Sequence, residues 1–505
     1  MPIRSASFLL KPAAAVTLVA LADLLLFDQE LGWTLGLVAL AFPLAALALT
    51  PALRRDRLAR VAVLAAGAFA LVQVERPTPL GLLLFWTCLC IAVLAPRAGP
   101  RDDAWRWVQR LAFLGAVSSF APWLDLVRLN RARRRAGRPR RLRDLLAMLI
   151  LPLVGGAVFL GLFAEANPLI EHAVDSLRLP AIDVARALFW LFGLIAAWAV
   201  LRPRTRRNWL PLPEGRAGGL PGVGVGSLTL SLIVFNALFS LQNGLDLAFL
   251  WSGAALPQGM TLAEYAHRGA YPLIATALLA GLFVLLTLQP GSATAGRPLI
   301  RRLVVLWIVQ NIFLVASTAL RTIAYVEAYS LTRLRIAALV WMGLVALGLA
   351  LICWRLIRGR SAAWLIGVNA AAAALVLAAC SLVDLGAVAA HWNVRHAREV
   401  GGRGATLDVC YLRRLGPAAL VSLAQLEQRP LPVGLRERVA HARQAGLLRL
   451  RSEQGDWRSW TFRGARRLAA AEALARAAPL PPATQDCAGA PLVATPRPLT
   501  LETFP

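Results

Sequence analysis

The chain has 505 residues, of which 58% are hydrophobic, and its mean hydropathy of +0.61 excludes an ordinary soluble globular protein. Its formal net charge of +27 comes almost entirely from arginine, because Lys11 is the sole lysine. Arginine in such excess is typical of the cytoplasmic loops of membrane proteins, which meet anionic lipid headgroups. No nucleic-acid recognition motif accompanies the charge, so we expect the lipid bilayer, and no nucleic acid, as a partner.

Repeated apolar runs of about 17–25 residues are long enough to cross the roughly 30 Å core of a bilayer as helices. We therefore predict an all-α fold. It consists of a polytopic membrane helix bundle of about eleven transmembrane helices in residues 1–391 and a small C-terminal helical extramembrane domain. The expected spans lie near residues 12–28, 32–50, 61–75, 79–96, 145–166, 181–201, 227–250, 272–290, 303–321, 336–354 and 363–390.

The first of these spans begins like a secretory signal peptide. A basic start precedes an apolar run, and the small residues Ala20 and Ala22 resemble a cleavage site. The apolar run continues beyond that site, from Leu24 to Phe27. We therefore predict an uncleaved first span.

A further apolar segment, Leu111–Val127, is long enough to suggest another span, but basic residues flank both of its ends. A spanning helix should not have strongly positive loops on both sides of the membrane. We therefore predict that this segment forms an interfacial or re-entrant helix.

The distribution of arginine in the loops predicts the topology. Placing every arginine-rich loop in the cytoplasm puts the N-terminus inside, and the odd number of spans then puts the C-terminal region outside. We expect a protein of the bacterial inner (plasma) membrane, with an outer, periplasmic helical domain at 392–477 and a disordered tail at 478–505. In that oxidising compartment Cys410 and Cys487 are predicted to form a disulfide. The alternative is two unpaired thiols, because Cys487 lies in the tail.

Polar residues interrupt the apolar runs between Ser227 and Met342. On a helix that advances by about 100° per residue, Asn236, Asn243 and Asp246 share one face of the seventh span. An ionised side chain near the bilayer core costs roughly 2.5–3.5 kcal/mol on insertion scales, and so it indicates a functional site. The candidate binding cluster, expected at the outer membrane face, consists of Asn243, Asp246, Glu264, His267, Arg268, Gln310, Arg321, Tyr325 and Glu327.

Two interpretations of this cluster stay open. It could bind an anionic headgroup or a sugar-like ligand. Alternatively, Asp246 and the arginines form structural ion pairs, and the other polar residues hold the helices together.

Motifs for metal binding and catalysis are incomplete. Glu264 and His267 match half of a di-iron helix motif, but the sequence lacks the second half. It also lacks H-E-x-x-H, G-x-S-x-G and paired C-x-x-C motifs. We therefore assign no metal, no cofactor and no catalytic residue, and the sequence leaves open whether the protein is an enzyme.

Several long strings carry a resemblance to a known family. They are QNGLDLAFLWSGAALPQGMTLAEYAHRGAY from Gln242, WIVQNIFLVASTALRTIAYVEAYSLTRLR from Trp307, LFAEANPLI from Leu162 and LDVCYLRRLG from Leu407. With these strings the chain resembles an uncharacterised bacterial membrane family that is known only as a domain of unknown function, of the 4153/4173 type. The resemblance covers about residues 145–470 and implies a membrane architecture, without an activity or site residues.

Two classes of function follow. The first is an envelope-associated structural, sensing or signalling protein, whose outer domain contacts lipid headgroups or other envelope components. The second is a transporter or a membrane enzyme that handles an anionic or lipid-linked envelope substrate. A transporter predicts internal repeats. We find no convincing repeat between the first five and the last five spans, so the first class is favoured.

Overall fold

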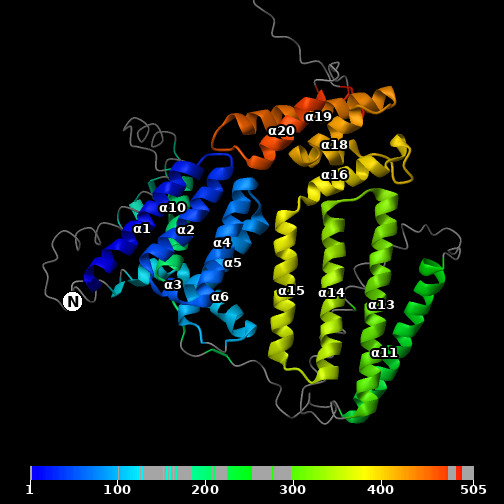
Figure 1. The fold of residues 1–505 in the computed structure, drawn as a ribbon, viewed down its shortest axis with the longest axis horizontal. Coiled ribbons are helices and arrows are strands. Elements are labelled where there is room, and N and C mark those ends of the chain that lie inside the picture. Colours follow the sequence, from blue (N-terminus) through cyan, green and yellow to red (C-terminus); the bar gives the residue numbers. More distant parts are fainter. Residues whose placement is uncertain are drawn as a thin grey trace, which may run out of the picture.

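The computed structural model describes residues 3–99, 102–125, 183–206, 224–252, 297–475 and 485–491, with isolated positions in between. Every regular element in these ranges is a helix, so the all-α prediction is confirmed for them. The helices form two bundles, and a cap of helices lies across one end of both (Figure 1). Seven of the described helices are long and apolar enough to cross a membrane. The expected spans near 145–166 and 272–290 fall almost entirely outside the described residues, so the count of about eleven stays a prediction.

The first bundle is held together by close packing around α4 and α5. Buried alanines, among them Ala62, Ala66 and Ala70, recur on one face of α4 and let its neighbours approach closely. Phe85 and Leu89 of α5 fill the centre. The elements of this bundle are α1 (Ile3–Leu26), α2 (Trp33–Leu49), α3 (Ala52–Arg55), α4 (Arg57–Glu75), α5 (Pro79–Leu94), η1 (Ala95–Arg97), α6 (Ala104–Ser118) and α10 (Val184–Leu201).

The second bundle is centred on the long helix α13. Trp307 of α13 is buried and makes ring contacts with Phe235 and Phe239 of the neighbouring helix α11. Thr332 caps the start of α14 by accepting a hydrogen bond from the Arg335 N–H. The elements of this bundle are α11 (Val225–Asp246), η2 (Leu247–Trp251), α13 (Pro298–Tyr329), α14 (Arg333–Arg358) and α15 (Ala362–Leu382).

The cap has an apolar core of its own, with Leu412, Leu426 and Val439 at its centre. Cys410 of α17 is bonded to Cys487, which ties the segment 485–491 to the cap. The elements of the cap are α16 (Leu385–His396), η3 (Arg398–Val400), α17 (Val409–Arg414), η4 (Gly416–Ala418), α18 (Leu420–Glu427), α19 (Val433–Gly455) and α20 (Phe462–Ala475).

The predicted single span at 363–390 is wrong, because the chain forms two helices there. α15 ends at Leu382, Val383 is extended, and Asp384 caps the start of α16 by accepting hydrogen bonds from the N–H groups of Gly386 and Ala387. The apolar residues that follow pack into the core of the cap. The cap therefore begins at α16, seven residues before the predicted domain boundary at 392.

The described long helices run in both directions relative to the cap (Figure 1). α1, α4, α11, α13 and α15 run towards it, whereas α2, α5, α10 and α14 run away from it. α11 and α13 are parallel, since Asn243 contacts Gln310 and Asp246 contacts Arg321. The turns 27–32, 76–78 and 330–332 therefore lie at the cap end.

α6 contains the first half of the segment that was predicted to be interfacial or re-entrant. It begins at Ala104, earlier than the predicted start at Leu111, because Asp103 caps it by accepting from the Arg106 N–H. Its 15 residues span about 22 Å, less than the core of a bilayer. α6 packs against α5, α10 and α15 at the end of the molecule opposite the cap.

Candidate functional site

Two polar sites stand out among the described residues: a buried seam between α11 and α13, and a charged junction between the cap and both bundles. In the seam, Asn236 Nδ2 donates to the carbonyl oxygen of Leu303, and Asn243 Nδ2 donates to that of Gln310. The amide of Gln310 donates back to Asn236 Oδ1 at 3.3 Å and to Ser240 Oγ at 3.1 Å. The sequence had placed Asn236 and Asn243 on one helical face, and here that face meets α13.

An ion pair between Asp246 and Arg321 continues this seam towards the cap. Asp246 is 0% exposed and Arg321 is 3% exposed. Gln242 donates a further hydrogen bond to Asp246. A buried charge is tolerated only when it is paired and hydrogen-bonded, so the two side chains depend on each other.

The structure divides the predicted cluster. Asn243, Asp246, Gln310 and Arg321 come together in the seam. Tyr325 lies one helical turn beyond Arg321 on α13, with the Arg335 guanidinium 4.4 Å from its ring centroid. The remaining members are exposed Glu327, at the base of the cap, and three residues outside the described ranges: Glu264, His267 and Arg268.

The second site is a network in which arginines of α20 bind carboxylates from both bundles. Glu75, the last residue of α4, pairs with Arg463 and Arg466, each at 3.0 Å. Asp384, which follows α15, pairs with Arg76 and Arg467, each at 2.5 Å. Arg463 contacts both bundles. Besides Glu75 of the first bundle, it reaches the end of α15 in the second, where it donates to the carbonyl oxygen of Leu382 and lies 4.0 Å from Asp384.

The network changes the proton affinities of its members. Burial alone would raise the pKa of the Asp384 carboxyl, but a hydrogen bond from Arg467 and the charges of Arg76 and Arg467 bring that pKa well below its usual range. Burial lowers the pKa of Arg467; hydrogen bonding to Asp384 opposes this shift, and the charges of Arg76 and Arg463 add to it. The arginines around Asp384 therefore hold its carboxyl group in the charged form.

A backbone contact holds the cap on the first bundle beside this network. The Trp33 N–H, at the start of α2, donates to the carbonyl oxygen of Trp460 at 2.8 Å, and the Trp33 indole donates to that of Trp457 at 2.7 Å. The approach is so close that a Cβ on Gly32 would lie 2.3 Å from the carbonyl oxygen of Arg458. The loop between α19 and α20 therefore docks directly on the N-terminus of α2.

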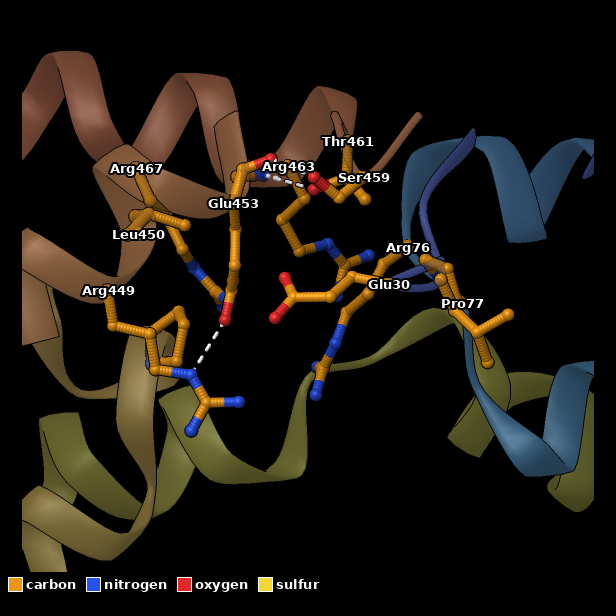
Figure 2. Close-up of a pocket in the computed structure, with 13 residues that line it drawn as sticks. Glu30, Arg76, Pro77, Arg449, Leu450, Glu453, Ser459, Thr461, Arg463 and Arg467 are labelled. Carbon is orange, nitrogen blue, oxygen red and sulfur yellow. Dashed lines mark hydrogen bonds and ion pairs between the residues drawn. The ribbon is translucent and has the colours of Figure 1, made fainter. Parts of the chain in front are cut away.

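A cavity of about 380 Å³ opens between this loop, α19, α20 and the turns of the first bundle. Figure 2 shows Glu30, Arg76, Arg463 and Arg467 around it, with Glu453 turned towards Arg449, from which its carboxylate accepts a hydrogen bond at 2.7 Å. A second cavity of about 440 Å³ lies against α20 between the ends of α4 and α15, and it shares Arg463 and Arg467 with the first. Both cavities are lined with more arginine than carboxylate.

Sequence reasoning missed this junction, although one signal was present. Arg463, Arg466 and Arg467 follow the i, i+3, i+4 spacing that places side chains on one helical face. Glu75, the partner of Arg463 and Arg466, is almost 390 positions away in the chain, and no local pattern links it to them. Among the described residues, no group of three or more histidines, cysteines or acids could hold a metal ion.

Seven membrane-length apolar helices, a buried intramembrane ion pair and a helical cap are the architecture of a multi-pass helical membrane protein. Residues 58–426 match the family described as "Domain of unknown function (DUF4153)", and the chain belongs to this family. The resemblance drawn from the sequence is thereby confirmed. Comparisons with curated proteins and with solved structures find no match.

Proposed function

We propose that this protein is a structural and sensing component of the bacterial inner membrane, in which the cap lies outside and holds two transmembrane bundles together. The ion pairs that join α20 to Glu75 and Asp384 are called the clasp. The contacts of Arg463 carry this proposal. One side chain on α20 binds Glu75 of the first bundle and the end of α15 in the second. A change outside the membrane that loosens this clasp alters how the two bundles are held together.

The charge distribution supports an outer cap. The ends opposite the cap carry arginine in short connections, including Arg54, Arg57 and Arg97, and again Arg301 and Arg358 in the second bundle. Short arginine-rich loops favour the cytoplasmic side, whereas charges in a long extramembrane domain have little weight. This rule directs the N-terminus to the cytoplasm and the cap to the periplasm.

The cysteines support the same orientation. Cys410 and Cys487 of the cap are bonded, whereas the four described cysteines of the long helices are free: Cys88, Cys90, Cys353 and Cys380. Disulfides persist in oxidising compartments such as the periplasm and are rare in the cytosol. A disulfide in the cap therefore fits an outer location.

The clasp is suited to sensing because it is ionic and partly open to solvent. The side chains of Arg76 and Glu75 are each 33% exposed, and that of Arg466 is 60% exposed. Ion pairs with this degree of exposure are screened by salt and respond to competing ions. A cap held only by apolar contacts would lack this response.

A clasp variant tests the proposal. In cells that lack the gene, a copy carrying Glu75→Gln and Asp384→Asn is compared with wild type and with Arg451→Gln. Arg451 pairs with Glu472 on the cap, and its side chain is 52% exposed. We expect the double variant to reach the membrane in normal amount but to leave the cells sensitive to osmotic and detergent stress. Arg451→Gln should behave as wild type.

A distance measurement shows whether the clasp has opened. Spin labels are placed at two exposed positions, Leu71 on α4 and Leu375 on α15, after the free cysteines have been replaced. We expect the double variant to broaden the distance distribution. Broadened distances without any envelope phenotype would overturn the proposed function. A defect confined to the movement or turnover of one anionic solute would favour the alternative, a transporter or membrane enzyme.

A further inference from the structure

The junction holds more positive than negative charge. Arg76, Arg463, Arg466 and Arg467 share two carboxylates, those of Glu75 and Asp384. Each carboxylate has at least two arginine partners, so the group carries a formal surplus of two positive charges (four arginines minus two carboxylates). The side chains of Arg463 and Arg467 are only 15% exposed, so water screens them poorly.

Guanidinium groups with free N–H positions are suited to phosphate. An arginine presents five N–H donors in a planar fork that matches phosphate oxygens in a bidentate way. In the second cavity Arg463, Arg466 and Arg467 come from successive turns of one face of α20. A phosphate in this cavity would meet several of these forks and offset the surplus charge.

The position of the cavity indicates a lipid as the source of that phosphate. The cavity lies between the cap end of α4 and that of α15, where two membrane-length helices end. This is the level at which headgroups of the bilayer lie. Its remaining wall is apolar, formed by Leu382, Val421 and Ala470, and such a wall suits the glycerol and upper acyl region of a lipid.

We propose that the junction binds the phosphate group of an anionic phospholipid, with α20 and the ends of α4 and α15 as its walls. In the adjoining cavity the Glu30 carboxylate lies among the same arginines, whereas that of Glu453 also accepts a hydrogen bond from Arg449 (Figure 2). Carboxylates accept hydrogen bonds, so this cavity receives the hydroxyl groups of a headgroup such as glycerol. The inference deepens the proposed function, since the clasp would then respond to the lipids around it.

Binding is measured on the purified full-length protein by native mass spectrometry. Phosphatidylglycerol, phosphatidylcholine and inorganic phosphate serve as separate probes. We expect one phosphatidylglycerol to be retained through detergent exchange, with weaker retention of phosphatidylcholine and no retention of inorganic phosphate. Arg466→Gln removes the most exposed fork and leaves the Arg463–Glu75 pair. It should weaken retention about ten-fold.

Two further variants make the test decisive. Arg451→Gln, an exposed α19 position outside both cavities, should retain the lipid as wild type does. Arg466→Lys keeps the charge but removes the fork, so it should weaken retention even if Arg466→Gln fails to fold. Equal retention of both lipids by all forms would overturn the proposal, and retention of inorganic phosphate alone would overturn the lipid source. Lipid retention is measured on purified protein, whereas the proposed function is tested by the envelope phenotype of cells. Either proposal can therefore fail without the other.

Discussion

Asp246 and Arg321 form the most deeply buried ion pair among the described residues. Leaving one partner of a buried pair without the other costs about 3–5 kcal/mol, whereas neutralising both often costs far less. The neighbouring amides Asn236, Asn243 and Gln310 bond to backbone and side chains across the same helix contact. The seam therefore acts as a structural connection between α11 and α13.

Charge neutralisation tests this role. We expect Asp246→Asn and Arg321→Gln each to lower the unfolding temperature in detergent, and the double variant to recover part of the loss. Arg451→Gln, at an exposed pair, should shift the free energy of unfolding by less than about 1 kcal/mol. Additive losses would show that the two residues act through separate partners. Unchanged stability with a lost cell phenotype would assign the seam to a ligand.

Gly32 is a second position where one atom matters. An added Cβ would lie 2.3 Å from the carbonyl oxygen of Arg458 and 2.4 Å from the carbonyl carbon of Ser459. Both neighbours are backbone, so the loop must move, and overpacking of this kind costs about 1–3 kcal/mol. We expect Gly32→Ala to speed hydrogen exchange at the Trp33 amide, which bonds to Trp460.

Gly67 provides the matched control for that substitution. It lies inside α4 of the first bundle, whereas Gly32 lies in the turn before α2, and nothing stands within 4 Å of the Gly67 Cβ position. Gly67→Ala should be neutral or stabilising, because alanine is favoured in helix interiors by about 1 kcal/mol. Equal effects of the two substitutions would show that the loop does not depend on close contact at Gly32.

At the scale of the elements, α20 and the start of α16 are joined by a pH-dependent contact. The pKa of Asp384 is lowered in the folded protein, so its contribution to stability is complete above the pKa of an unfolded aspartate, about 3.9. The contribution is lost as the pH falls below that value towards the folded pKa. Docking of the cap should therefore be unaffected down to about pH 5 and weaken as the pH falls below about 4 towards the lower folded pKa.

Limited proteolysis across this pH range measures the effect. We expect cleavage in the loop between α19 and α20 to increase in wild type as the pH falls. Asp384→Asn, which has already lost the charge, should show more cleavage at neutral pH and a flatter response to acid. Parallel curves for the two proteins would mean that a group other than Asp384 controls docking.

At the scale of the whole molecule, the charges of the loops predict which side of the membrane the cap faces. Reporter fusions after Arg207, Leu331 and Pro505 should report cytoplasmic, periplasmic and periplasmic positions. Labelling of free thiols provides a second readout, since Cys410 and Cys487 should react only after reduction. A cytoplasmic signal at Pro505 would reverse the orientation of the cap, as would be expected if Leu111–Val127 crossed the membrane.

The sequence by itself determined the helical membrane architecture, because a bilayer requires long apolar segments and these are visible locally. It also placed Asn236, Asn243 and Asp246 on one helical face, because helical periodicity is a local property. It did not reveal the break at Asp384, where a capping side chain interrupts an otherwise continuous apolar run.

Only the tertiary structure decided which charges meet. Arg463 lies in the cap and Glu75 in the first bundle, and the two residues are 388 positions apart in the chain. An arginine-rich helix has the same local pattern whether its partner is water, lipid or a distant carboxylate. The clasp exists because α4 and α15 end at the same level and α20 lies across both, and this arrangement is a property of the packed chain.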